Sequence, residues 1–285
     1  MAMTRCYTRD TVNAPRPGVA LPCNKSLPCD DDDAAVADGS SSNRQFESVV
    51  EFDLCQQLPT LPAGIATLYE AVRARRDRQD EFMLGYHFDV GAIDGQTMPA
   101  STAQALYWYK RAADNGHTIA QLNLGVLYET GHQNAQARDY PRAVRWYYQA
   151  ALSGHQGAQF NLGRLFWSGK GVPQDLKTAF GFFKKAAKKG NHMAMTNVGA
   201  MYMSGNGVRA NANEARRWSQ LAAMKSNAVA HHNLGVMYEN GLGGRRDLEL
   251  AASHFRQALD PAMDHPVSEA LSRELRRSRD PLIFT

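Results

Sequence analysis

Cysteine is scarce in this chain of 285 residues, and its uneven distribution limits the classes of protein that are consistent with the sequence. All four cysteines (Cys6, Cys23, Cys29 and Cys55) lie in the N-terminal part of the chain. A small secreted fold held together by disulfides is therefore excluded. Cys23 and Cys29 lack two further ligands at zinc-site spacing, so we expect free thiols and no metal site there.

Long apolar runs are also missing. No apolar stretch reaches the roughly 18 residues that a transmembrane helix needs. The basic residues Arg5 and Arg9 are not followed by the apolar region of an ordinary secretory signal. We therefore expect a cytoplasmic location without a membrane span, with leaderless export as the open alternative.

An excess of charge of one sign is absent as well. The net charge is +4, from 32 basic and 28 acidic residues, which makes a mixed surface rather than a polycation. Nucleic-acid-binding domains usually show a concentrated basic footprint, so we expect no nucleic-acid partner. Lys184, Lys185, Lys188 and Lys189 do cluster. They suit a solvated helix end, where cations are favoured, and binding of an anionic partner through such Lys and Arg patches is the alternative.

Catalytic motifs are the fourth absence. Gly169 and Gly171 begin no G-x-G-x-x-G fingerprint, no serine has a lysine three residues later, and the nine histidines form no H-E-x-x-H motif. The sequence therefore predicts a protein that is not an enzyme and has no catalytic residues, no cofactor and no metal. A hydrolase-type enzyme with its site in a groove is the competing hypothesis.

The chain does contain an internal repeat. A marker glycine recurs every 36 to 40 residues, and each is followed three residues later by an aromatic residue and six residues later by a second glycine. The markers are Gly85, Gly125, Gly163, Gly199 and Gly235. A period in this range is typical of solenoids, whose units each bury their apolar face against their neighbours.

Each repeat has the pattern of two helices. The first should end at the second glycine in a left-handed cap, and the marker glycine should allow close approach of the paired helix. The second should begin after a residue that favours the N-cap, and these residues are Ser101, Asp139, Asp175, Asn211 and Asp247. Gln104, three residues after Ser101, could complete a capping box.

The pattern of the repeats resembles that of the Sel-one-like repeats, relatives of the tetratricopeptide repeats. The copy at 158–193 carries it most fully, in Ala158, Asn161, Leu162, Gly163, Phe166, Gly169, Gly171, Val172, Ala179, Phe182, Phe183, Ala186, Ala187 and Gly190. The resemblance implies an all-α fold, a right-handed α/α superhelical solenoid, and a role in assembling protein complexes. Secreted members of the family staple their repeats with cysteine pairs, and this chain has none there.

The sequence divides into four parts on this basis. Residues 1–42 are rich in proline, serine and aspartate and are predicted to be a disordered tail, and residues 43–79 to be degenerate capping helices. About five repeats follow, at 80–119, 120–157, 158–193, 194–229 and 230–260. Residues 261–285 are predicted to form a C-terminal capping helix and tail, with a basic binding element as the alternative.

Candidate binding residues lie on the first helix of each repeat, which builds the concave face of a solenoid. One set recurs two residues before the marker glycine: Asn123, Asn161, Asn197 and Asn233. Their amides could bind a partner's backbone, or bond neighbouring helices and serve only the fold.

A second set varies between repeats, as residues that determine specificity do. Arg164 follows its marker directly, while Trp167, Met203 and Glu239 stand four residues after theirs. Trp and Arg are enriched in binding hot spots, so we expect Arg164 and Trp167 to contact a partner. The sequence thus predicts a protein–protein interaction scaffold or adaptor, in signalling or complex assembly, whose protein or peptide partner and oligomeric state it leaves open.

Overall fold

The computed structural model describes residues 49–51, 53–54, 56–131 and 138–260, and these form a stack of antiparallel helix pairs. The first helices of the pairs are α4 (Arg78–Val90), α6 (Thr118–Thr130), α8 (Gln156–Ser168), α10 (His192–Ser204) and α12 (Ala228–Asn240). The second helices are α5 (Thr102–Asp114), α7 (Tyr140–Leu152), α9 (Leu176–Lys188), α11 (Ala212–Ala223) and α13 (Leu248–Ala258).

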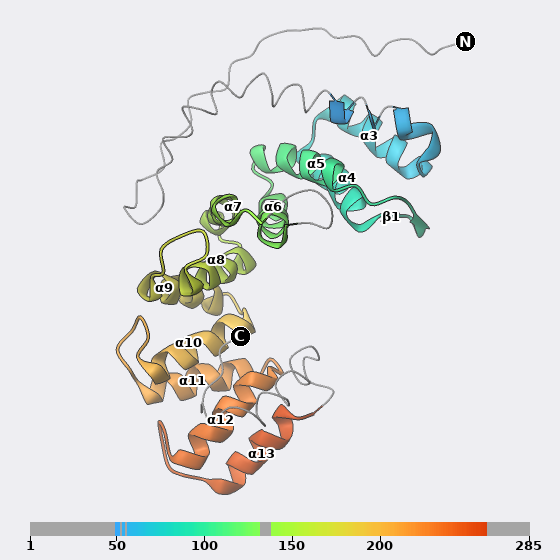
Figure 1. Ribbon diagram of the computed structural model, residues 1–285. Helices are drawn as coiled ribbons and strands as arrows, with labels where there is room; N and C mark the ends of the chain where they lie inside the picture. Colours follow the sequence, from blue (N-terminus) through green and yellow to red (C-terminus); the bar gives the residue numbers. More distant parts are fainter. Residues whose placement is uncertain (1–48, 52, 55, 132–137, 261–285) are drawn as a thin grey trace, which may run out of the picture.

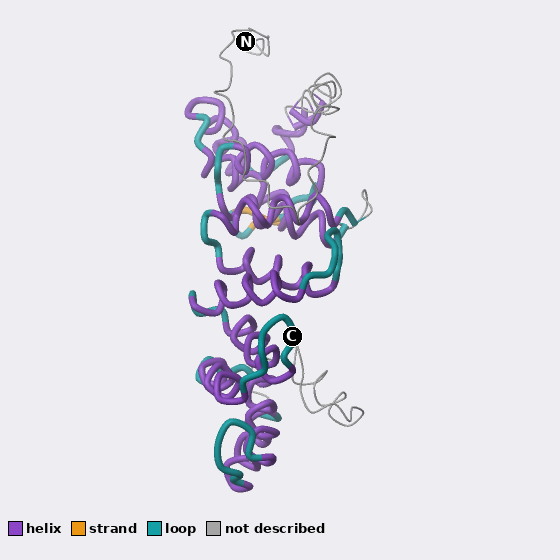
Figure 2. Tube along the Cα trace, turned by 90° about the vertical axis from the view of Figure 1, so that its left-hand side faces the viewer, coloured by secondary structure: helices purple, strands orange, loops and turns teal. Residues whose placement is uncertain are grey.

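The pairs follow one another along an arc, as expected for a solenoid. Figure 1 shows α6 and α8 on the inner side of the arc, with α7 and α9 on its outer side. In Figure 2 the helices lie across the long axis of the molecule, one layer above the next. The predicted all-α solenoid is confirmed.

The predicted helix ends are confirmed in every repeat. The side chains of Ser101, Asp139, Asp175, Asn211 and Asp247 each accept a backbone N–H in the first turn of a second helix. Glycines in the left-handed conformation end the first helices at Gly91, Gly131, Gly169, Gly205 and Gly241. These capping hydrogen bonds and left-handed glycines fix where each helix starts and stops, independently of the packing between repeats.

The N-caps of the first helices were not predicted, and two of them are histidines. The Nδ1 atoms of His117 and His155 accept the backbone N–H groups of Ala120 at 3.1 Å and Ala158 at 3.4 Å. Asn191 and Asn227 fill the same position in the next two repeats. An imidazole can accept through Nδ1 only while that nitrogen is unprotonated, so these two caps require neutral histidine.

The histidine caps should make the fold sensitive to acid. Burial lowers the pKa of His117 and His155 in the folded protein, with contributions from Arg78 and Lys189 respectively. Their stabilisation is therefore present above the unfolded pKa of about 6.5 and is lost as the pH falls below it. We expect the free energy of unfolding, measured by urea denaturation, to be lower at pH 5.0 than at pH 7.5, by about 1 kcal/mol for each lost cap.

Asparagine supplies the matched variant, because the protein already uses it at this position. The double variant His117→Asn and His155→Asn should match the parent at pH 7.5 and lose less stability at pH 5.0. His231, His232 and His254 remain in both proteins, and burial lowers the pKa of each, so a smaller acid sensitivity will persist. Equal losses in parent and variant would contradict the role of the caps.

The marker glycines lie where the two helices of a pair touch. A Cβ at Gly125 would stand 2.4 Å from the Tyr147 ring, and one at Gly163 would stand 2.5 Å from the Phe183 ring. Those rings come from the second helix of the same pair and are fully buried. In these two repeats the glycine thus lets an aromatic ring approach the backbone of the first helix closely, which sets the distance between the paired helices.

One element differs from the predicted pattern. The loop after α4 forms a short antiparallel ribbon, in which β1 (Ala92–Ile93) pairs with β2 (Gln96–Thr97). Asp94 and Gly95 connect the two strands with positive φ values of 50° and 75°. An Asp-Gly pair is a hairpin-turn signal, so this ribbon could have been predicted from the sequence.

The N-terminal end of the solenoid is covered by helical residues at 49–51, 53–54 and 56–57, by η1 (Leu58–Thr60) and by α3 (Ala63–Arg75). Val50 and Leu54 are buried in the same core cluster as α5. Gln104 makes only half of the expected capping box. Its backbone N–H reaches Ser101, but its side chain donates to the Val50 carbonyl at 2.8 Å and accepts from Trp108. The side chain therefore ties the N-terminal segment to α5 instead of closing the cap.

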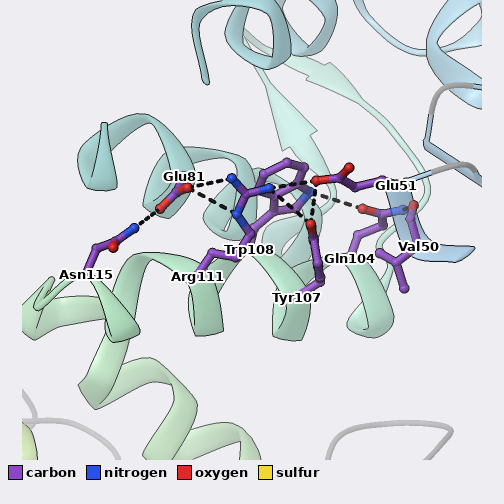
Figure 3. A network of polar contacts seen from close by, with 8 residues as sticks. All are labelled: Val50, Glu51, Glu81, Gln104, Tyr107, Trp108, Arg111 and Asn115. Atoms are coloured by element: carbon purple, nitrogen blue, oxygen red, sulfur yellow. Dashed lines mark hydrogen bonds and ion pairs between the residues drawn. The ribbon is translucent and has the colours of Figure 1, made fainter. Parts of the chain in front are cut away.

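A charged network completes this attachment (Figure 3). The Arg111 guanidinium lies between two carboxylates, with Nη1 at 2.7 Å from Glu51 and Nε at 3.1 Å from Glu81. The Tyr107 hydroxyl also donates to Glu51, and the Asn115 amide donates to Glu81 at 2.9 Å. Glu81 is 1% exposed, so its charge depends on these partners.

Three predictions concern parts of the chain that are not described. The disordered tail at 1–42, the first residues of the N-terminal capping helices and the capping helix at 261–285 lie outside the described residues. Among the described helices, none is both long and apolar enough to cross a membrane.

Candidate functional site: a pocket on the concave face

Two repeats place a tyrosine of the second helix against an acidic residue of the first. The Tyr109 hydroxyl donates to Asp89 at 3.2 Å, and the Tyr147 hydroxyl donates to Glu129 at 2.8 Å. Burial, together with the neighbouring carboxylate, raises the pKa of both tyrosines, which therefore stay protonated and donate. Asp89 and Glu129 both stand four residues after a marker glycine.

The third repeat departs from this pairing. Phe183 occupies the position of the tyrosines and has no hydroxyl that an acidic residue could accept. The position four residues after the marker holds Trp167 in this repeat, where the two preceding repeats carry an acidic residue. The fifth repeat also has a phenylalanine, Phe255, at the position of the tyrosines, and it keeps the acidic Glu239.

A pocket of about 250 Å³ opens at this point of the concave face. It is lined by residues of α6, α8, α9 and α10 and by the loop that follows α8. They are Glu129, Arg164, Leu165, Trp167, Ser168, Lys170, Phe183 and Asn197. Three repeats therefore contribute to one site, which no single repeat could form.

Arg164 is held at one wall of the pocket by two contacts. Its Nη2 lies 2.9 Å from Oε1 of Glu129, and its Nη1 donates to Oδ1 of Asn161 at 3.3 Å. The Arg164 side chain is 42% exposed, whereas that of Glu129 is 14% exposed. Glu129 has both oxygens engaged, by Arg164 and by Tyr147, so the arginine is the more accessible charge of the pair.

The predicted binding residues are distributed unevenly around this pocket. Arg164, Trp167 and Asn197 line it, and Asn161 holds Arg164 in place. Met203 is half-buried against the core, and Glu239 is exposed at the end of α12.

The asparagine row serves the fold at the positions where its contacts are described. Asn123 and Asn161 hydrogen-bond the hydroxyls of Tyr109 and Tyr147, each in the preceding repeat. Asn233 is 1% exposed, so its amide lies beneath the surface. These two contacts fit the alternative interpretation, in which the asparagines bond neighbouring helices.

Glu129 is the site residue that the sequence interpretation missed. It stands in the same position as Glu239, four residues after the marker, and its partner Tyr147 stands where Phe183 stands in the next repeat. Asp89 and Glu129 occur in repeats that have a tyrosine, whereas Glu239 occurs in a repeat that has a phenylalanine. A comparison of these two positions between repeats therefore does not by itself pair the acid with the hydroxyl.

Three lysines of the cluster at the end of α9 have described contacts within the protein. Lys189 donates to the Gly154 carbonyl, Lys184 lies over the Phe180 ring at 5.4 Å, and Lys185 lies over the Phe182 ring at 5.4 Å. These contacts fit the interpretation as helix-end and outer-face cations. Within the described residues, no group of three or more His, Cys, Asp or Glu side chains is arranged to hold a metal ion.

Stacked helix pairs that follow one another along an arc define an α/α solenoid of the repeat-protein class. The family model of the Sel1 repeat matches five consecutive segments, at residues 80–117, 118–155, 157–191, 192–227 and 228–260. The chain therefore belongs to the Sel1 repeat family, and the resemblance inferred from the sequence is confirmed. Proteins of this family generally mediate protein–protein interactions.

Solved structures agree with this assignment. A protective antigen of uropathogenic Escherichia coli with an SLR fold is 28% identical over 78% of this chain, with a TM-score of 0.65. The present chain spans 45% of the length of that protein. A Sel1 repeat protein from Oxalobacter formigenes is 24% identical, with a TM-score of 0.60, and the match covers 82% of this chain and 84% of that one. A comparison with curated proteins gave no match.

Proposed function

We propose that this protein is a non-enzymatic scaffold that binds a partner polypeptide on the concave face of its solenoid. The general role of the family in protein–protein interaction supports this proposal. The observation that carries it is the pocket between α6, α8 and α10, in which Arg164 and Trp167 meet. These two residue types dominate the energetic centres of interfaces, where they fill partly desolvated sites.

The proposed binding face extends from this pocket in both directions. Asn123 and Asn161 lie on α6 and α8, and Met203 and Glu239 lie on α10 and α12. Asn197, which lines the pocket, and Asn233 are 2% and 1% exposed, so they support the face from beneath. The pocket is small, so it suits a side chain of a longer ligand more than a free small molecule. Residence in the cytoplasm is part of this proposal, because the repeats contain no cysteine pairs.

Substitution of the tryptophan tests the proposed function. Trp167→Ala should weaken the capture of a specific partner by about tenfold or more, because a half-buried aromatic anchor is removed. The measurement is quantitative affinity capture with the full chain, followed by titration of the identified partner. Helix content by circular dichroism should stay unchanged, since Trp167 lies at the rim of the core.

Met224→Ala is the matched control for this experiment. Met224 is 78% exposed and lies at the end of α11, a second helix, away from the pocket. Its removal should leave partner binding within about twofold of the parent. Equal binding by the Trp167→Ala variant and the parent would refute the concave pocket as the binding site. Turnover of a small molecule by the purified chain would refute the non-enzymatic role.

A further inference from the structure

The pocket offers more hydrogen-bond donors and more positive charge than the protein itself uses. An arginine has five N–H donors, and the contacts to Glu129 and Asn161 engage two of them. Both oxygens of Glu129 already accept bonds, so this carboxylate has little left to offer a ligand. Lys170, also in the lining, is exposed, with its ammonium 5.6 Å from the Tyr140 ring.

Arg164 stands in a row of otherwise uncharged residues. The position directly after each marker glycine is filled by Tyr86, Val126, Arg164, Ala200 and Val236 along the described first helices. Tyr86 is 42% exposed and Val126 is 39% exposed, so both present apolar surface. A ligand that crosses from α4 to α8 therefore meets apolar side chains first and a positive charge next.

We infer that the partner segment is an extended peptide that places an acidic side chain on Arg164 and Lys170 and an apolar side chain against Val126. This inference rests on the proposed function and adds the chemistry of the ligand. A carboxylate matches a guanidinium because charge-assisted hydrogen bonds are shorter and stronger than neutral ones. The neighbouring Trp167 covers the aliphatic part of the acidic residue.

The geometry also sets the spacing of the two side chains. The Arg164–Glu129 ion pair bridges the successive first helices α6 and α8, which therefore lie roughly 10 Å apart, and an extended peptide advances about 3.3 Å per residue. Val126 and Arg164 occupy equivalent positions on successive first helices, so the apolar and the acidic residue should stand about three positions apart. The binding face continues beyond the pocket on both sides, toward Tyr86 and toward Met203. The carboxylate therefore belongs to a side chain within the peptide, not to its C-terminus.

Peptide selection on the full chain tests the inference. A phage-displayed library of random 12-residue peptides is selected on the immobilised protein, and the enriched sequences are aligned. We expect Asp or Glu, with an apolar residue three positions away, to be enriched. The best peptide is then made with an amidated C-terminus, with a fluorophore, and in a second form that carries Asn or Gln in place of the acid.

Fluorescence anisotropy compares the two peptides. The acidic form should bind at least about tenfold more tightly than the amide form, and the difference should shrink as salt is raised. On Arg164→Gln the two forms should bind within about threefold of each other, since the carboxylate loses its guanidinium partner and keeps only the exposed Lys170 ammonium. The double variant Glu129→Gln and Arg164→Gln should behave in the same way, and it leaves no unpaired buried carboxylate in the protein.

Distinct results would overturn the inference and the proposed function. Peptides that need Trp167 but show no enrichment of acid, or that bind equally as acid and amide, would overturn the acidic ligand and leave the concave face as a binding site. Acidic peptides whose preference survives Arg164→Gln would overturn the assigned contact. Selected peptides that bind the Trp167→Ala variant as well as the parent would overturn both.

Discussion

Gly163→Ala should be strongly destabilising, although alanine is the better helix former. The added Cβ would stand 2.5 Å from Cδ1 of Phe183, a ring that is fully buried and has nowhere to move. Overpacking of this kind costs about 1–3 kcal/mol, and the intrinsic gain from replacing glycine in a helix is about 1 kcal/mol or less. Because the clash involves a whole ring edge, we expect a net loss of about 2 kcal/mol in the free energy of unfolding, measured by urea denaturation.

Gly181→Ala provides a control in the same repeat. Gly181 lies within α9, and a Cβ there would meet no atom within 4 Å. The substitution should raise stability by up to about 1 kcal/mol, since the helical propensity acts without a clash. The two variants thus make the same chemical change with opposite expected signs. A Gly163→Ala protein at least as stable as the parent would show that α8 and α9 are not held at this distance by the glycine.

The second large effect is expected at the N-terminal end, for Arg111→Ala. This change removes the cation between Glu51 and Glu81 and the contact over the Trp108 ring at 5.0 Å. Glu81 would keep the hydrogen bond from Asn115 but would remain a buried carboxylate without a positive partner. Removal of one member of a buried ion pair costs about 3 kcal/mol or more. We expect a loss of this size in the free energy of unfolding, measured by urea denaturation at pH 7.

A double-mutant cycle separates charge from packing in this network. Glu81→Gln with Arg111→Ala should be more stable than Arg111→Ala alone, because the unpaired charge is removed from the interior. If the double variant were as unstable as the single one, the loss would come from the missing side-chain volume of Arg111. Limited proteolysis should cut the single variant first near Glu51, which Arg111 holds by an ion pair.

Much of the fold follows from short-range chemistry that is visible in the sequence. Asp175 caps α9 and Gly169 ends α8 because an aspartate oxygen satisfies the first-turn N–H groups and glycine adopts positive φ without strain. The same residue types recur at the same spacing in each repeat, so the helix ends assigned in one repeat could be transferred to the others. The histidine caps were missed because His117 and His155 act through one neutral nitrogen, a role seldom assigned to histidine.

The candidate site was predictable only in part. Arg164 and Trp167 differ from the residues at the same positions in other repeats, and this difference marked them. Glu129 was missed because it belongs to the preceding repeat, and its role depends on the Tyr147 hydroxyl that reaches it across the helix pair. Asn123 and Asn161 were open to two interpretations, binding of a partner's backbone or bonding to neighbouring helices, and both hydrogen-bond tyrosines of the preceding repeat. Such pairings join residues up to 35 positions apart, as between Arg164 and Glu129.

The sequence by itself determined the repeat, the helix ends and the close approach at the marker glycines, because each depends on residue types at fixed local spacing. Only the tertiary structure decided that α6, α8 and α10 share one pocket, that Glu129 fixes Arg164 there, and that Gln104 and Arg111 hold the N-terminal segment. The physical reason is distance along the chain. Local hydrogen bonds fix each helix pair, whereas the curvature that brings side chains of successive repeats together arises from packing across the whole stack.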